Sequence, residues 1–190
     1  SRTLTVNDME NYSYAINGCY LSNVSDFDEK KYEVYLSKIT EKAKNKPIEG
    51  LISKNYAPKD DSNIKKEERV FYTRENALAI DRNLIDEIVD EGFKKYFLAP
   101  LITEASIHVN TSGVFKGFYK DKTTGIGCFG GKGKNALSRI QGRIELKKPV
   151  LSRYESTIIL HKEDTMALSK RLKNLDVAYL DPPYNQHPYG

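Results

Sequence analysis

The chain has 190 residues, of which 39% are hydrophobic, and its formal net charge is +4. This length fits one domain or two small ones, and the hydrophobic content is sufficient for a buried core. The two cysteines, Cys19 and Cys128, show no spacing typical of a zinc site or a disulfide framework. Because no apolar run is long enough to cross a membrane and no signal peptide is visible, we expect an intracellular protein that binds no membrane.

Strand and helix signals alternate at the start of the chain. Residues 3–6 alternate and are rich in β-prone types, which predicts a short strand that ends at Asn7 and Asp8. A first helix is predicted by apolar residues that recur at helical spacing, namely Met9, Tyr12, Ile16 and Tyr20. A second helix is predicted to start near Ser25, where acidic residues follow, and its apolar face comprises Phe27, Val34, Tyr35 and Ile39.

The middle of the chain predicts a loop followed by two helices. Prolines, glycine and a charged run make residues 46–68 mostly loop. Thr73 is a suitable N-cap for an amphipathic helix that Gly92 ends, with an apolar face of Ala77, Ile80, Leu84 and Ile88. Another apolar helix is predicted over residues 95–109, and Pro100 must lie near its start or kink it.

Strands and helices alternate again near the end of the chain. Residues 156–160 predict a strand, a short helix capped by Asp164 follows, and the apolar run 177–180 predicts a buried strand. This alternation favours an α/β fold with a parallel sheet and crossover helices. Ligands bind beyond the carboxyl ends of such strands, which is where three acidic residues are expected: Asp8, Asp164 and Asp181.

Residues 110–154 are rich in glycine and in basic side chains. They contain ten basic and two acidic residues, a net charge of +8, so the rest of the chain carries −4. This polarity indicates a segment that binds a polyanion, although a solvated basic face would have the same composition. Residues 125–130 spell G-x-G-x-x-G, but no convincing strand precedes them, so we do not interpret them as a dinucleotide site. The three histidines are too far apart in the sequence to indicate a metal site.

The tetrapeptide Asp181-Pro182-Pro183-Tyr184 has a recognisable chemistry. The amino nitrogen of adenine is a poor nucleophile, because its lone pair is delocalised into the ring. The Asp181 carboxylate and the Pro182 carbonyl, held by a stiff Pro-Pro backbone, are acceptors that can draw the amino hydrogens out of the ring plane. Tyr184 offers a flat face on which an extruded base can stack. The alternative is a simple turn that ends a strand, since Asp-Pro is common there.

The segment from Asp164 to Gly190 resembles the adenine-specific DNA methyltransferases of the Dam-like class, whose signature is DPPY. The continuation after Tyr184 is similar to the restriction-modification members of this family. Asn7-Asp8 resembles the acidic position that holds the ribose hydroxyls of S-adenosylmethionine, and Asp164 resembles the position that meets the adenine of this cofactor. The stretch from residue 109 to residue 115 also looks like a segment of these enzymes.

The resemblance implies a function and a set of site residues. It implies methyl transfer from S-adenosylmethionine to the exocyclic amino group of adenine in double-stranded DNA, in a cytoplasmic protein associated at most with the prokaryotic nucleoid, alongside a cognate restriction endonuclease. The implied catalytic residues are Asp181, Pro182, Pro183 and Tyr184, the implied cofactor-binding residues are Asp8 and Asp164, and no metal is implied. We expect DNA contacts, chiefly to phosphates, from Asn110, Lys116, Lys132, Lys134, Arg139 and Arg143.

The expected architecture is part of a Rossmann-like methyltransferase sheet with a large, mainly helical inserted recognition domain. Asp8 and Asp181 are 173 residues apart, far more than a bare passage through three strands needs. We therefore expect residues 1–22 and 155–190 to be parts of the catalytic, cofactor-binding domain and residues 23–154 to be the inserted target-recognition region. The glycine loop with which the family grips the methionine part of the cofactor does not occur here. We expect a fragment that binds the cofactor poorly by itself.

Two alternatives stay open at this point. Some enzymes that methylate adenine in ribosomal RNA also carry DPPY, but the length of the insertion favours a domain that reads duplex DNA. The chain could instead be an inactive DNA-binding fragment of a methyltransferase, since the glycine loop is missing.

Overall fold

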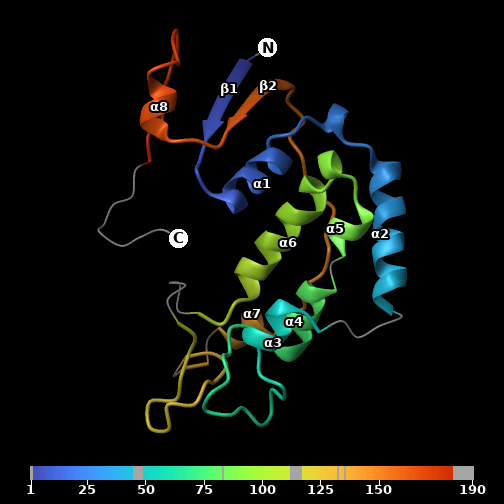
Figure 1. Ribbon diagram of the computed structural model, residues 1–190, viewed down its shortest axis with the longest axis vertical. Helices are drawn as coiled ribbons and strands as arrows, with labels where there is room; N and C mark the ends of the chain where they lie inside the picture. Colours follow the sequence, from blue (N-terminus) through green and yellow to red (C-terminus); the bar gives the residue numbers. More distant parts are fainter. Residues whose placement is uncertain are drawn as a thin grey trace.

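The computed structural model describes residues 2–44, 49–82, 84–111, 117–131, 133–134 and 136–181. It shows a mixed α/β chain in which two short strands lie at one end of a set of helices (Figure 1). Strand β1 (Arg2–Asn7) pairs in parallel with β2 (Ser156–His161), so the start of the chain lies beside a segment more than 150 residues away. The register places Leu4 opposite Ile158 and Asn7 opposite His161. The two strands and their parallel pairing confirm the prediction from sequence.

The helices are short, apart from two. They are α1 (Asn11–Tyr20), η1 (Val24–Asp26), α2 (Glu29–Lys44), α3 (Leu51–Asn55), α4 (Arg74–Asp81), α5 (Ile85–Ile88), η2 (Glu91–Phe93), α6 (Lys95–His108), α7 (Leu137–Gln141) and α8 (Thr165–Ser169). Among these helices, none combines the length and the apolar content that a membrane crossing requires.

The described residues cover one face of the sheet. Helix α1 packs between β2 and α6, and Gly18 allows close approach, because a Cβ at this position would lie 3.5 Å from Leu160 Cδ1. Ile158 and Leu160 are half-buried, whereas Ile159, which points to the opposite face, is exposed. Parallel sheets are usually covered on both faces, whereas Ile159 on the second face of this pair is exposed in the described part of the chain.

The hydrophobic core lies among α2, α5, η2 and α6. Tyr32 of α2 stacks on Phe97 of α6 with ring centroids 4.4 Å apart, and Phe93 meets Tyr96 edge to face. Helix α6 runs through the middle of the molecule, and its residue Pro100 is buried within the helix. These contacts explain why the α6 segment is apolar on nearly every side.

Three predicted helix starts can be compared with the structure. Thr73 caps α4, since its hydroxyl accepts a hydrogen bond from the N–H of Asn76, and Asp164 caps α8 by accepting from the N–H of Ala167. Both predictions are confirmed. In α2 the cap is Asp28, which accepts from the N–H of Lys31, rather than the predicted Ser25.

Three other expectations are wrong in detail. The helix expected from Thr73 to Gly92 is divided into α4 and α5, and a short helix, α3, lies within the expected loop of residues 46–68. Val34 was expected on the buried face of α2 but is 52% exposed, because Tyr32 takes the inward position instead. Tyr32, Tyr35 and Ile39 follow one another at intervals of three and four residues, so they share the buried face of α2, and Val34 lies outside it.

The apolar run 177–180 does not form the predicted strand. Val177, Tyr179 and Leu180 are 84%, 85% and 74% exposed, and the run belongs to no strand. A strand of this composition is stable when neighbours satisfy its backbone groups on both sides. Neither β1 nor β2, the strands of the described chain, supplies such a neighbour.

Candidate functional site

The carboxyl ends of β1 and β2 bring two of the predicted acidic residues to the same edge of the sheet. Asp8 follows β1, and Asp164 follows β2 by three residues. The parallel register ends with Asn7 opposite His161, so both strands deliver the chain to this edge in the same direction. This pairing places the segments that contain Asp8 and Asp164 at one edge of the sheet, as expected from the sequence.

Both carboxylates are already engaged locally. Asp8 Oδ1 accepts from the N–H of Glu10 at 2.9 Å, and its Oδ2 accepts from the Ser13 hydroxyl at 2.6 Å, which ties the carboxylate to the start of α1. Asp164 Oδ1 accepts from the N–H of Ala167 at 2.8 Å. Each carboxylate oxygen has two lone pairs, so both side chains keep the capacity to accept further hydrogen bonds. Asp164 is exposed and Asp8 is half-buried, so solvent reaches the edge that they form.

The predicted catalytic tetrapeptide is only partly described. Asp181 is exposed and follows the apolar run 177–180. Pro182, Pro183 and Tyr184 lie outside the described residues, so the structure does not place them.

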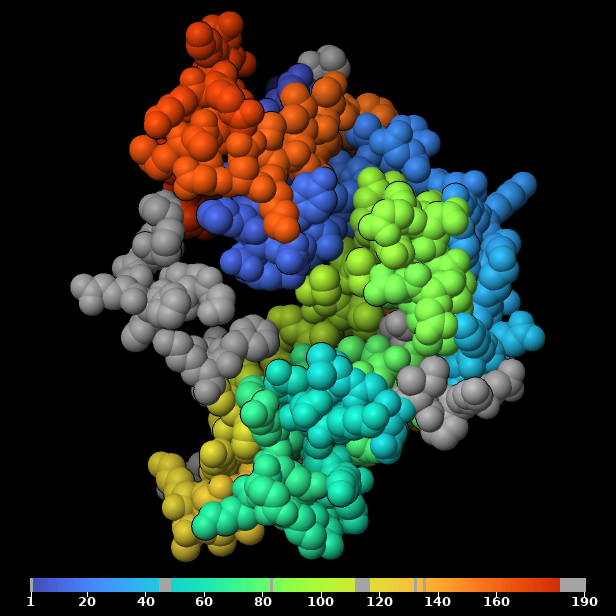
Figure 2. Space-filling model, viewed as in Figure 1, coloured from blue at the N-terminus to red at the C-terminus, as the bar shows by residue number. Residues whose placement is uncertain are grey.

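The glycine-rich basic segment lies at the opposite end of the molecule from the sheet. Figure 2 shows residues near 120–140 in yellow at one end and the region of β2 and α8 in orange at the other. Antiparallel bridges join Thr111 to Phe118 and Lys120 to Gly127, and a turn that begins at Asp121 connects the two sides of the second bridge.

The six residues expected to contact DNA differ in their surroundings. Lys134 is exposed and has a positive φ of 51°. Arg143 is exposed and pairs with Glu75 at 2.8 Å, an ion pair that solvent screens on both sides. Lys116 and Lys132 lie outside the described residues.

Asn110 is fully buried and holds the basic segment to the helical part of the chain. Its Nδ2 donates to the carbonyls of Val70 and Cys128, at 2.6 and 2.9 Å, and its Oδ1 accepts from the N–H of Gly130 at 3.0 Å. Every hydrogen-bonding direction of the amide except one acceptor site is therefore used within the chain. The side chain contributes to the fold of the basic segment.

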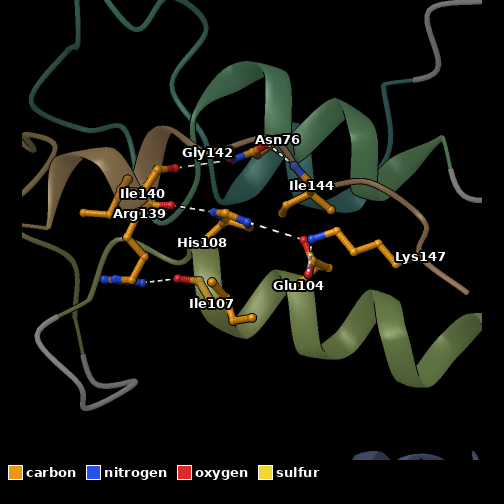
Figure 3. A network of polar contacts seen from close by, with 9 residues as sticks. All are labelled: Asn76, Glu104, Ile107, His108, Arg139, Ile140, Gly142, Ile144 and Lys147. Atoms are coloured by element: carbon orange, nitrogen blue, oxygen red, sulfur yellow. Dashed lines mark hydrogen bonds and ion pairs between the residues drawn. The ribbon is translucent and has the colours of Figure 1, made fainter. Parts of the chain in front are cut away.

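Arg139 also has a structural environment, shown in Figure 3. Its guanidinium donates to the carbonyl of Ile107 and, at 3.0 Å, to that of Val109, which caps the C-terminus of α6 with a positive charge. The carbonyl of Arg139 in turn lies against Nδ1 of His108. Arg139 thus joins α7 to the end of α6 from both its side chain and its backbone.

Glu104 and His108 extend this network along α6. Glu104 is 7% exposed; its Oε1 pairs with Lys147 Nζ at 2.9 Å, and its Oε2 lies 3.5 Å from Nε2 of His108. On the other side, Asn76 donates to the carbonyl of Gly142 and accepts from the N–H of Ile144 (Figure 3). Residues 139–147 are therefore fastened to both α4 and α6.

Sequence reasoning did not identify this polar network. The available signal was a carboxylate and an imidazole four residues apart on an otherwise apolar helix, a spacing that places Glu104 and His108 on one face. Among the residues that the structure describes, His, Cys, Asp and Glu form no group of three or more that could hold a metal ion. A pocket of about 450 Å³ lies between α4 and the loop that contains Asp60 and Asp61.

The chain is similar to three proteins that are named as methyltransferases or as a methylase. It is 30% identical over 190 residues to the Type II methyltransferase M.CviAII of Paramecium bursaria Chlorella virus 1, a match that covers 97% of this chain and 50% of that protein. It is 29% identical over 196 residues to the Type II methyltransferase M.NlaIII of Neisseria lactamica, covering 100% of this chain and 51% of the relative. It is also 29% identical over 155 residues to modification methylase LlaI of Lactococcus lactis subsp. lactis, covering 75% and 23%.

The chain thus spans about half the length of the first two relatives. No family model matches the chain, and no solved structure matches it. The similarities nevertheless run through both strands of the sheet and through the helices and the basic segment between them. All three relatives are named as Type II methyltransferases or as a modification methylase, so the described part of the chain resembles proteins of that kind.

Proposed function

We propose that the chain is part of an enzyme that transfers a methyl group from S-adenosylmethionine to the exocyclic amino group of adenine in double-stranded DNA. The observation that carries this proposal is the position of Asp8 and Asp164 at the carboxyl edge of a parallel strand pair. The same chain continues into Asp181-Pro182-Pro183-Tyr184. The similarity of the chain to Type II methyltransferases supports a role for these residues in methyl transfer.

The two carboxylates suit the polar parts of the proposed cofactor. A carboxylate accepts two hydrogen bonds from a diol, so Asp8 would hold the ribose hydroxyls, and the exposed Asp164 would accept from the adenine amino group. When bound, S-adenosylmethionine supplies a methyl group on a sulfonium, which a nitrogen nucleophile can displace directly. The residues present fit this ligand at its nucleoside end.

Asp181 and its neighbours would act on the target base. The carboxylate of Asp181 and the carbonyl of Pro182 would accept hydrogen bonds from the amino group and direct its lone pair. Pro183 would keep the backbone stiff, and Tyr184 would stack on the base after it has left the duplex. The amino nitrogen would form its new bond to the methyl carbon as the bond from that carbon to sulfur breaks, which leaves a neutral thioether; the nitrogen, positively charged at that point, would then lose one proton to solvent.

The basic segment would bind the DNA backbone, and residues 23–154 would form the recognition region inserted into the catalytic domain. Lys134 and Arg143 expose their charges, and we propose that they meet phosphates together with Lys116 and Lys132. Asn110 and Arg139 would serve the same interface indirectly, because their side chains hold the segment against Val70, Cys128 and the end of α6.

A methyl-transfer assay tests the proposed function. The full-length gene product is incubated with S-adenosylmethionine labelled on the methyl group and with either duplex DNA or RNA, and the products are digested to nucleosides. The proposal expects label in N6-methyladenine from DNA. Label in a cytosine derivative would overturn the proposed base, label in RNA alone would overturn the proposed substrate, and no transfer to either polymer would overturn the proposed activity.

A further inference from the structure

Asn7, the last residue of β1, makes an unusual set of contacts across the end of the sheet. Its Oδ1 accepts from the N–H of Glu163 at 3.1 Å, and its Nδ2 donates to the carbonyl of the same residue at 2.9 Å. The Nδ2 group also donates to the hydroxyl of Thr165 at 3.1 Å. One side chain therefore bonds to both backbone groups of a residue 156 positions away.

These bonds begin where the backbone pairing of the two strands ends. The register stops at Asn7 opposite His161, and the next backbone contact, from the N–H of Asp8 to the carbonyl of His161, is long at 3.4 Å. Beyond this point the amide of Asn7 replaces the backbone, since a primary amide presents the same donor and acceptor as a peptide group. The side chain thus continues the hydrogen bonding between the two segments beyond the end of the strand pairing.

The residues that form this contact are the sequence neighbours of both carboxylates of the proposed cofactor site. Asn7 immediately precedes Asp8, and its partners Glu163 and Thr165 stand on either side of Asp164. Any change in the Asn7 contacts shifts the loop after β2 relative to the end of β1, and it therefore shifts Asp164 relative to Asp8. A ligand that both carboxylates hold at once is sensitive to such a shift.

We infer that Asn7 is a positioning residue for the cofactor: its amide fixes the loop that contains Asp164 against the strand end that contains Asp8. The inference rests on the proposed function, because the ligand concerned is the nucleoside part of S-adenosylmethionine. Asn7 touches no part of this ligand in the inferred arrangement. It acts through the spacing of the two side chains that do.

Asn23 provides a matched control, because it makes a similar contact at the start of β2. Its Nδ2 donates to the carbonyl of Ser156 at 3.1 Å, and its Oδ1 accepts from the N–H of Ser156 at 3.0 Å. The chemistry is that of the Asn7 contact, but Ser156 begins β2, whereas the carboxylates follow its end. Loss of Asn23 removes an equivalent pair of bonds and leaves the carboxyl edge in place.

The test compares Asn7→Ala and Asn23→Ala in the full-length enzyme, with titration calorimetry of S-adenosylmethionine, steady-state kinetics and thermal unfolding. Both variants should lose similar thermal stability. Only Asn7→Ala should weaken cofactor binding, by about tenfold, which is the lower end of the effect found when a partner that orients a ligating side chain is removed. The KM for the cofactor should rise by a similar factor; a tenfold loss of binding corresponds to about 1.4 kcal/mol. The kcat at saturating cofactor should stay within about twofold of the wild-type value, because Asn7 touches neither the cofactor nor the reacting atoms.

Thr165→Val is the milder second variant, because it removes one of the three Asn7 bonds and keeps the volume of the side chain. It should give a smaller rise in KM, which makes the inference testable even if Asn7→Ala fails to fold. Two outcomes would overturn the positioning role of Asn7 but leave the proposed function standing. One is an equal loss of cofactor affinity in Asn7→Ala and Asn23→Ala; the other is normal cofactor affinity in both Asn7→Ala and Thr165→Val. Absence of cofactor binding by the wild-type enzyme would overturn the proposed function itself.

Discussion

Tyr32 and Phe97 are almost completely buried and stacked in the helical region, whereas Ile159 and Tyr179 in the sheet region remain 42% and 85% exposed. We use helical region for residues 23–154 and sheet region for residues 2–22 and 155–181. The helical region contains most of an aromatic core, to which Cys19 of α1 in the sheet region also belongs. The sheet region presents apolar residues and two carboxylates at a solvent-accessible edge. The comparison teaches that packing and the proposed chemistry are located in different parts of the chain.

The largest expected effect separates catalysis from DNA binding. Asp181→Ala in the full-length enzyme should reduce methyl transfer by at least about a hundredfold, the scale of losing one preorganised group that acts on the reacting centre. DNA affinity should stay within about twofold, since the charged segment proposed to bind DNA lies in the helical region. Single-turnover transfer and equilibrium DNA binding measure the two quantities.

Asp176→Ala is the control, because Asp176 is another exposed carboxylate only five residues earlier. It should leave both quantities unchanged. Normal turnover by the Asp181 variant would contradict the proposed mechanism, and equal losses of activity in the two variants would point to a general charge effect.

The second effect tests whether the core belongs to the helical region. Phe97→Ala should lower the free energy of unfolding by about 3–5 kcal/mol, because a fully buried ring is removed from a stack of aromatic side chains. Ile159→Ala should cost less than about 1 kcal/mol, since much of that side chain already contacts solvent. Denaturant unfolding of each variant provides the comparison, and similar losses would contradict the difference in packing between the two regions.

The sequence predicted the two strands and two of the helix starts because those features depend on local patterns. Strands at residues 3–6 and 156–160 follow from alternation and β-prone types, and the caps Thr73 and Asp164 follow from short polar side chains before apolar helices. The edge position of Asp8 and Asp164 then follows from the rule for parallel strands. The family resemblance at Asp181–Tyr184 agreed with the kind of relative that the comparisons found.

What the sequence could not predict depends on partners far away in the chain. The run 177–180 has the composition of a buried strand, but a strand also needs neighbours, and composition does not show whether they are present. Asn7, Asn23, Asn76 and Asn110 each bond to backbone groups of a distant segment, and nothing in their local sequence indicates these contacts. The same limit applies to Arg139, whose charge predicted a phosphate contact but whose guanidinium caps α6.

The third effect concerns a polar contact that stabilises the helical region. Asp81 accepts from the N–H groups of Gly50, Ile52 and Ser53, at 3.0, 3.0 and 2.7 Å, and so caps α3 from the end of α4. Burial by itself would raise the pKa of Asp81, but a hydrogen bond from the Ser53 side chain and these backbone hydrogen bonds outweigh it and hold the pKa below its usual value. Asp81→Ala should lower the free energy of unfolding at neutral pH by about 2 kcal/mol.

The lowered pKa sets the direction of the pH dependence. The contribution of Asp81 is fully present above the unfolded-state pKa of about 4 and is lost as the pH falls through the folded-state value. The difference in stability between wild type and Asp81→Ala should therefore shrink below about pH 4. Asp86→Ala is the control, since this exposed carboxylate pairs only at the surface with Lys94 and should cost less than about 0.5 kcal/mol. A difference for Asp81→Ala that stays constant with pH would contradict the role of the ionised carboxylate.

The smallest effect tests whether exposed charge in the helical region meets DNA. Lys134→Ala combined with Arg143→Ala should reduce the slope of log affinity against log salt by up to about two, because each phosphate contact contributes about 0.9. Near physiological salt the affinity should fall by roughly tenfold, without preference for one DNA sequence over another. Lys38→Ala combined with Lys42→Ala removes the same charge from α2 and should leave the slope unchanged.

Arg139→Ala distinguishes a structural contribution to the DNA-binding segment from a direct phosphate contact, since it should lower stability through the cap of α6 more than it lowers the salt slope. Equal slopes in the wild-type and Lys134/Arg143 proteins would mean that these charges form a solvated face, and the DNA contacts would then have to be sought elsewhere on the chain.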